Sequence, residues 1–202
     1  AAHLALTDAV DAPEPLLDPE RERALTERQR ELLAQLELVV NDGFDKLTMS
    51  ELASRLSCSL RTLYELAPSR DELVLLVLDR SLWRIGRDAQ AAIDTATDPL
   101  DAVRAYLHAT NVAVAAWTEP FARDIEAVPA ARRLAKGHND YLFGVTKALL
   151  DQAAATGQIA VDIDTAAVAQ AISALGRVYF KPSVRAAIDS SPNAAADQLN
   201  DL

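Results

Sequence analysis

The feature that most constrains the fold is a series of helix start and stop signals that divides most of the chain into helical segments. Three capping boxes, each a Ser or Thr followed three residues later by Glu or Gln, mark helix starts at Thr26, Thr48 and Ser69. Apolar residues follow each start at helical spacing, and Gly43 and Pro68 end the helices that precede them. Only six glycines occur in 202 residues. The sequence therefore predicts an all-α protein.

The same signals give the expected order of elements. The first helix starts near Glu20 or Thr26, a second starts at Thr48, a third covers 60–66, and a long one starts after Pro68. Further helices are expected near 99–117, 119–127, 130–156, 164–180 and 183–202, separated by prolines and Gly157. Residues 158–163 could be read as a strand, but the stretch is short and isolated. Residues 1–19 contain three prolines and four acidic residues, which predicts a flexible arm.

Composition and charge exclude some classes of protein and weaken another. No stretch reaches the roughly 18 uninterrupted apolar residues of a membrane span, and the N-terminal residues lack the basic-then-apolar pattern of a signal peptide. The single cysteine, Cys58, cannot form an internal disulfide, which favours the cytoplasm. A net charge of −10 argues against nucleic-acid binding, and residues 20–72 hold eight basic and eleven acidic side chains. Any DNA binding must therefore depend on a few well-placed cations.

The stretch from Thr48 to Leu66 has the pattern of a helix-turn-helix. Ala53 supplies the small residue where the two helices cross, and Cys58 can anchor the turn. The second helix is short and starts at Ser59, whose hydroxyl can cap the helix or contact a phosphate. A helix of this size fits the major groove of B-DNA, with its N-terminal residues nearest the base edges.

In order and spacing, the motifs over about residues 26–80 resemble those of TetR-family transcriptional regulators. They are Gly43-Phe44, Thr48-Met49-Ser50-Glu51-Leu52-Ala53, Ser59-Leu60-Arg61-Thr62-Leu63-Tyr64 and Pro68-Ser69-Arg70-Asp71-Glu72-Leu73. The resemblance implies a DNA-binding domain over 20–68, after the arm of 1–19, and a helical ligand-binding and dimerisation domain over 69–202. It implies a repressor that binds a palindromic operator as a homodimer and responds to a small, mostly apolar effector.

Matching positions give the expected DNA-binding residues. Thr48 and Arg70 resemble positions that contact phosphates, and Tyr64 matches a tyrosine whose hydroxyl meets the backbone. Ser59, Leu60, Arg61 and Thr62 lie where the family reads bases and holds the strand. Glu65, Leu66 and Ala67 depart from the family pattern. A carboxylate at 65 facing DNA repels phosphates unless it accepts a hydrogen bond from a cytosine amino group.

The remainder of the chain supplies expected effector and dimer residues. Aromatic and polar side chains that could line an effector cavity are Trp83, Tyr106, Thr110, Trp117, Phe121 and Tyr141. For any one of these aromatics an ordinary core position is favoured, and it is the family resemblance, not the spacing, that favours a pocket for the group. The apolar stripe of the small-residue helix after Gly157 is either internal core or a dimer seam; it comprises Val168, Ile172, Leu175 and Tyr179.

Two other classes of function compete with the repressor. One is a small-molecule-binding protein of the same fold with weak or lost operator binding, which Glu65, Leu66 and the acidic balance favour. The other is an enzyme, but no nucleophile elbow, phosphate loop or paired catalytic carboxylates occur. His108 and His138 lack metal-ligand spacing, so neither a metal nor a cofactor is expected.

Overall fold

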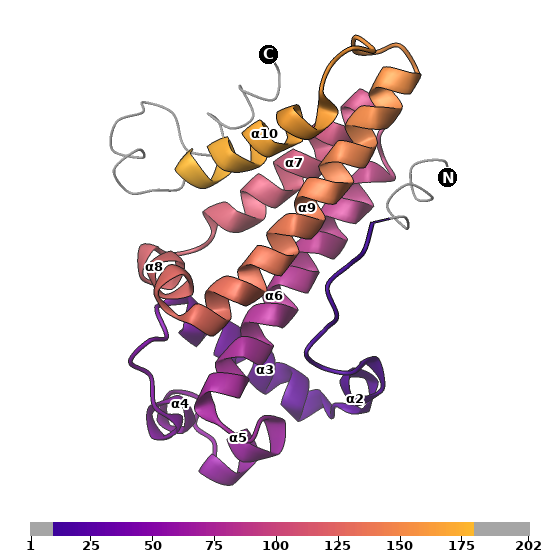
Figure 1. Cartoon of the computed structure of the whole chain (residues 1–202). Helices are drawn as coiled ribbons and strands as arrows, with labels where there is room; N and C mark the ends of the chain where they lie inside the picture. Colours follow the sequence, from indigo (N-terminus) through magenta and orange to yellow (C-terminus); the bar gives the residue numbers. More distant parts are fainter. Residues whose placement is uncertain (1–9, 180–202) are drawn as a thin grey trace. The chain divides into compact units, whose positions relative to one another are not determined.

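The structure is a computed structural model that describes residues 10–179, and all its regular elements are helices (Figure 1). They are α2 (Pro19–Ala24), α3 (Glu27–Asn41), α4 (Met49–Arg55), α5 (Leu60–Leu66), α6 (Arg70–Ile93), α7 (Pro99–Ala115), α8 (Glu119–Ala127), α9 (Pro129–Ala155) and α10 (Thr165–Tyr179). None of the helices within 10–179 is both long and apolar enough to cross a membrane. The predicted all-α fold is confirmed, and the predicted helix over 183–202 lies outside the described residues.

The described chain forms two compact units. The first, here the head unit, comprises residues 14–83 and 117–137. The second, here the body unit, comprises 10–13, 84–116 and 138–179. The division falls within α6 and within α9, so each of these helices contributes to both units.

The predicted capping boxes form the helix starts of the head unit. Thr26 caps α3 with Gln29, and Thr48 caps α4 with Glu51, each through reciprocal hydrogen bonds. The Ser69 hydroxyl donates to the Glu72 carboxylate and accepts from the Glu72 N–H, at 3.2 Å each. Gly43, with a φ of +107°, follows α3 in the left-handed region that glycine favours. Side-chain capping thus set these helix starts as predicted.

The core of the head unit is built mainly from leucines. Those almost fully removed from solvent lie on α3, α4, α5 and α6, which cluster together in Figure 1; they are Leu32, Leu36, Leu52, Leu63, Leu73 and Leu78. Phe121 and Ile125 of α8 join the same cluster. Burying each such side chain contributes roughly 1.5–3 kcal/mol, so this core holds α4 and α5 on a rigid base.

The N-terminal segment differs from the expected flexible arm in its second half. Asp18 caps α2 by accepting from the Glu20 N–H at 2.7 Å, and Pro19 occupies the first helical position. Leu17 is buried in the head-unit core, and the Leu16 N–H donates to the Asp79 carboxylate at 2.8 Å. Proline is favoured at the first position of a helix, so Pro19 starts α2 and does not break structure.

The body unit has a separate core of aliphatic residues and one tyrosine. Ile93, Tyr106, Val145, Leu149 and Ala169 are almost completely buried there, from α6, α7, α9 and α10. Burial raises the pKa of the Tyr106 hydroxyl, because the charged form loses its hydration. Residues 158–163, considered above as a strand, contain no strand.

Candidate nucleic-acid interface

The two helices α4 and α5 form a helix-turn-helix joined by a tight turn. The Cys58 N–H donates to the Ala53 carbonyl at 3.0 Å and the Ser57 N–H to the Ser54 carbonyl at 3.2 Å. Ser57 has a φ of +51°, the left-handed conformation that ends a helix in this kind of turn. Ala53 is buried in the head-unit core, and Cys58 is half-buried against it.

One face of α5 is exposed because the other packs into the core. Leu63 and Leu66 are buried. In contrast, Arg61 and Tyr64 are exposed, and Thr62 is partly exposed. Tyr64 is 52% exposed, and Leu60 is also exposed. The helix therefore presents a phenol, an apolar side chain and a guanidinium, the groups that meet phosphate oxygens, thymine methyls and guanine in DNA complexes.

The hydroxyls at the start of α5 are bonded to each other. Ser59 caps the helix by accepting from the Thr62 N–H at 3.1 Å, and the two hydroxyl oxygens lie 2.8 Å apart. Each hydroxyl keeps further hydrogen-bonding capacity after these contacts. Their assignment as DNA contacts remains a prediction.

Arg61 and Glu65 form an ion pair one turn apart on α5. The Arg61 Nε lies 3.2 Å from Glu65 Oε1, with the two side chains 89% and 55% exposed. An exposed pair of this kind contributes only about 0–1 kcal/mol. Arg61 can therefore leave Glu65 for a stronger partner at little cost.

Thr48 and Glu51 form a local network at the start of α4. The Glu51 carboxylate accepts from the Thr48 N–H at 2.8 Å and from the Thr48 hydroxyl at 2.7 Å. These hydrogen bonds lower the pKa of the exposed Glu51 carboxyl. The Thr48 hydroxyl proton is already donated to Glu51, so a phosphate contact by this hydroxyl requires it to turn away from Glu51.

Arg70, predicted to contact a phosphate, is bound within the protein. Its Nε donates to the Leu47 carbonyl at 2.7 Å, its Nη2 donates to the Phe44 carbonyl, and its Nη1 meets Asp71 at 2.6 Å. Only about a fifth of the side chain is exposed. In this structure the guanidinium holds the loop before α4, a role that sequence reasoning missed because main-chain carbonyls carry no sequence signal.

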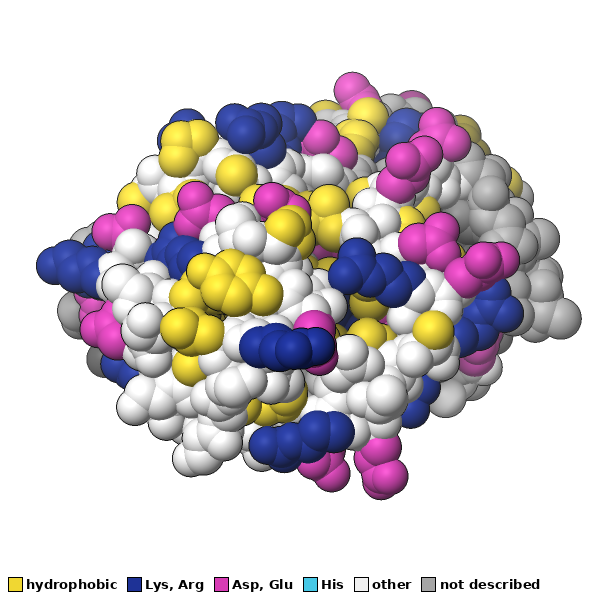
Figure 2. All heavy atoms as spheres, turned by 90° about the horizontal axis from the view of Figure 1, so that it is seen from below, with side chains coloured by type: hydrophobic (Ala, Val, Ile, Leu, Met, Phe, Trp, Pro, Cys, Tyr) yellow, Lys and Arg dark blue, Asp and Glu magenta, His cyan; other side chains and the backbone are white. Residues whose placement is uncertain are grey.

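The surface seen from below in Figure 2 carries no continuous basic patch. Lysine and arginine side chains stand apart from one another on this face, with acidic side chains beside or between them. This agrees with the excess of acidic over basic residues between 20 and 72. A broad electrostatic attraction to DNA is therefore weak on this face.

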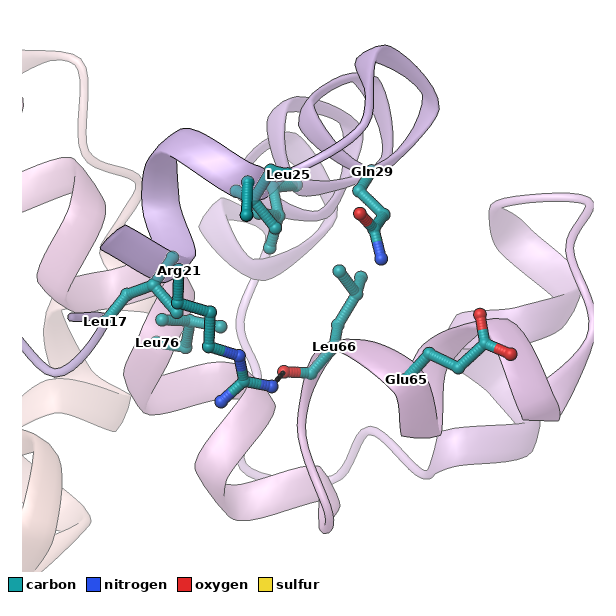
Figure 3. A pocket seen from close by; sticks show the side chains of 9 residues that line it. Leu17, Arg21, Leu25, Gln29, Glu65, Leu66 and Leu76 are labelled. Atoms are coloured by element: carbon teal, nitrogen blue, oxygen red, sulfur yellow. Dashed lines mark hydrogen bonds between the residues drawn. The ribbon is translucent and has the colours of Figure 1, made fainter. Parts of the chain in front are cut away.

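A pocket of about 150 Å³ lies beside the helix-turn-helix, between α2, α3, α5 and α6. Figure 3 shows Arg21 reaching from α2 to the Leu66 carbonyl, to which its Nη2 donates at 3.2 Å. Leu17, Leu25 and Leu76 are among the apolar lining residues. The volume is below the 300–1,000 Å³ usual for small-molecule sites. The Arg21 contact ties α2 to the C-terminal end of α5.

The predicted effector residues fall into two separate cores. Trp117 and Phe121 stack edge to face at 5.3 Å in the head unit, and Phe121 meets Phe44 at 5.8 Å in the same way. Tyr106 lies in the core of the body unit and Tyr141 packs against that core; the Thr110 hydroxyl donates to the Tyr106 carbonyl at 2.9 Å. Trp83 is half-buried at the end of the head-unit stretch of α6. Effector binding by these residues remains a prediction.

The predicted dimer stripe lies on α10. Val168 and Ile172 pack partly against the body-unit core, and Leu175 is 37% exposed. Tyr179 is the last residue of the helix. Among Val168, Ile172 and Leu175, Leu175 is the most exposed and the least accounted for by the body-unit core.

Comparisons with known proteins give a consistent fold. No family model matches the sequence, and no curated protein matches it significantly. Among solved structures, a TetR-like regulator from Rhodococcus sp. RHA1 is 22% identical, with a TM-score of 0.64 over 87% of this chain and 96% of that one. The TetR-family regulator PfmR from Thermus thermophilus is 16% identical, with a TM-score of 0.63 over 85% and 95%. AibR, solved with isovaleryl coenzyme A and operator DNA, is 16% identical, with a TM-score of 0.61 over 86% and 96%.

Proposed function

We propose that this chain, which has the fold of TetR-family transcriptional regulators, is a DNA-binding repressor that a small, mostly apolar molecule releases from its operator. Residues 20–68 form the DNA-binding domain and 69–202 the effector-binding and dimerisation domain. The protein acts in the cytoplasm as a homodimer and not as an enzyme. Structural neighbours that are transcriptional regulators support the general assignment.

The observation that carries the proposal is the exposed face of α5. Arg61, Leu60 and Tyr64 project from a short helix whose other face is fixed in a leucine core. A helix held rigidly at one face and bearing a guanidinium at its start is suited to the major groove. Because one such helix covers few base pairs, selective binding needs two of them on a palindrome.

The nature of the effector rests on the aromatic and apolar residues near the two cores. AibR, a neighbour in fold, was solved with an acyl coenzyme A thioester. We infer an apolar, aromatic or acyl effector for this chain, with Trp83, Tyr106, Thr110, Trp117, Phe121 and Tyr141 as candidates for its contacts.

A second candidate function is a small-molecule-binding protein of this fold with weak or lost operator binding. The ion pair between Arg61 and Glu65 favours it, because the carboxylate neutralises the cation of α5 and lies on the exposed side of the helix. The acidic balance of residues 20–72 acts in the same direction.

Selection from a random duplex library separates the two functions. If the chain is a repressor, we expect the selection to enrich a palindrome whose half-sites are about one helical turn apart. In a gel-shift assay the protein should then retard that duplex and not a scrambled one. Failure of the folded protein to enrich any sequence would refute the repressor and leave the second candidate.

A further inference from the structure

The loop between α3 and α4, residues 43–47, is held by charged side chains from two other helices. This loop leads directly into α4, which packs against α5 and whose Leu52 and Ala53 are buried in the head-unit core. Any displacement of the loop is therefore passed to α4 and then to the exposed face of α5.

The acidic side of this arrangement is Asp124 of α8. Its Oδ2 accepts from the Phe44 N–H at 2.6 Å and from the Asp45 N–H at 2.9 Å, and the residue is almost completely buried. Arg123 Nε lies 3.6 Å from the other carboxylate oxygen. A buried carboxylate is costly unless hydrogen bonds compensate for its lost hydration, and here two main-chain amides do so.

The basic side is Arg70, which donates to the carbonyls of Phe44 and Leu47. The main chain of Phe44 thus gives its N–H to an anion and its carbonyl to a cation. Opposite charges at the two ends of one residue fix both its position and its orientation. Charge-assisted hydrogen bonds of this kind are about twice as strong as neutral ones.

Apolar contacts hold α8 against the same loop. The Phe44 side chain is buried, with Phe121 edge-on at 5.8 Å. A Cβ added at Gly43 would lie 3.0 Å from the Pro120 Cβ, so the loop approaches α8 closely. The Thr118 hydroxyl donates to the Asn41 carbonyl at the end of α3. Helix α8 and its cap residue Thr118 therefore contact the end of α3 and the loop as far as Asp45.

We propose that Asp124 is a positioning residue for operator binding: from outside the helix-turn-helix it holds the loop that sets α4 and α5. This inference rests on the proposed function. Asp124 contacts no DNA in this scheme, and it acts through the Phe44 and Asp45 amides. Operator affinity is then controlled in part by α8, although residues 20–68 carry every predicted base contact.

The test compares two variants of Asp124 with a charge-matched control. Asp124→Ala removes the oxygen that accepts both amide hydrogen bonds, and Asp124→Asn keeps a neutral oxygen that can still accept. Glu126→Gln removes the same charge from an exposed position of α8. Loss of a negative charge alone strengthens attraction to DNA in all three variants. Displacement of the loop weakens binding, so the two effects have opposite signs.

Binding is measured by fluorescence anisotropy with the duplex that the wild-type protein selects and with a scrambled duplex, at a temperature where circular dichroism shows every variant folded. We expect Asp124→Ala to lose at least tenfold in affinity for the selected duplex and to change less than twofold on the scrambled one. Asp124→Asn should fall between, and Glu126→Gln should bind as tightly as wild type or more tightly. Amide exchange at Phe44 and Asp45 should accelerate in the Asp124 variants alone.

Two results overturn the inference in different ways. If both Asp124 variants bind the selected duplex within twofold of wild type, Asp124 is not a positioning residue, and the proposed function stands. If Asp124→Ala does not fold, Asp124→Asn decides the matter by the same criterion. If the wild-type protein selects no sequence, the proposed function fails first, and this inference falls with it.

Discussion

Arg61 is the cation of α5, and the proposed sequence-specific binding depends on its release from Glu65. We predict that Arg61→Ala weakens operator binding by roughly 1–3 kcal/mol, the value of a bidentate contact to guanine, and relaxes sequence preference. Anisotropy titrations at fixed salt measure the loss. Arg55→Ala, which removes an exposed cation from α4, is the matched control. It should weaken binding to the selected and the scrambled duplex equally. An equal loss on both duplexes for Arg61→Ala would contradict the prediction.

In the proposed complex, Glu65 would oppose DNA binding in two ways, because it would repel phosphates and it pairs with Arg61. We predict that Glu65→Gln tightens binding to a scrambled duplex, because the like charge is removed and Arg61 is released. The effect should shrink as salt is raised, which titrations at several salt concentrations would measure. Weaker binding to the operator alone would instead place the carboxylate on a cytosine amino group. No change on either duplex would mean that Glu65 points away from DNA.

Some residue-scale contacts are readable from sequence and others are not. Thr48 with Glu51 is a local pattern three residues long, so its capping network could be predicted. The partners of Arg70 are main-chain carbonyls 23 and 26 positions earlier, and those of Asp124 are amides about 80 positions earlier. Every residue has such groups, so only the fold determines which of them a charged side chain meets.

At the scale of elements, the turn between α4 and α5 stores conformational strain. Ser57 adopts a φ of +51°, which costs an L-residue about 1–2 kcal/mol and glycine almost nothing. We predict that Ser57→Gly stabilises the protein because it relieves this strain. Glycine loses more backbone entropy on folding, which limits the gain in unfolding free energy to about 1 kcal/mol. Urea unfolding measures the change, and Ser54→Gly, within α4, should destabilise instead. A lower stability for Ser57→Gly would show that the strain is not relieved.

Helix boundaries followed the sequence where capping was local. The predicted third helix is identical to α5, because Ser59 starts it and Pro68 prevents its continuation. Helix α2 was not expected as a separate element, because prolines and acidic residues around it resemble a disordered arm. Its order depends on distant contacts, namely Leu17 in the core and Arg21 on the Leu66 carbonyl. Composition cannot reveal such contacts.

The expected effector residues illustrate a limit of periodicity. Spacing identifies which face of a helix is apolar but not which core that face enters. Trp117 and Phe121 therefore looked equivalent to Tyr106 and Tyr141, whereas the first pair joins Phe44 in the head unit. The chain passes between the two units four times, and this path is a property of the folded molecule.

For the molecule as a whole, assembly is the first prediction. We expect a two-fold dimer through α10 and the segment after it, with Leu175 in the seam. Leu175→Asp should give a folded monomer in light scattering, because the exposed side chain is not needed in the body-unit core. Val161→Asp is the control, since Val161 is 84% exposed and lies outside α10. A monomeric wild-type protein would rule the dimer out. Ile172 is less suitable, because it also packs on the core.

Coupling between effector and operator is the second whole-molecule prediction. Helix α6 starts at Arg70, which binds the loop before α4, and it continues into the body unit. A tilt of this helix caused in the body unit would therefore displace the loop before α4. We predict that an effector raises the operator dissociation constant and that operator weakens effector binding by the same factor. A hundredfold factor corresponds to about 2.7 kcal/mol. Medium-chain acyl thioesters and aromatic acids that raise the melting temperature serve as probes in paired titrations. A bound probe without effect on operator affinity would contradict the coupling for that compound.

The excess of acidic over basic side chains in residues 20–72 has a consequence for how the proposed repressor would be distributed on a chromosome. A genome offers about 10⁶–10⁹ competing non-specific sites, and phosphate neutralisation by basic side chains supplies most of the affinity for them. For the proposed repressor, the net charge of −10 and the acidic excess of residues 20–72 predict weak binding to bulk DNA. Few copies are then sequestered, and most stay free to collide with the operator directly. We therefore expect the proposed repressor to find its operator mainly through solution, with little sliding along the duplex, so that modest operator affinity would suffice for high occupancy.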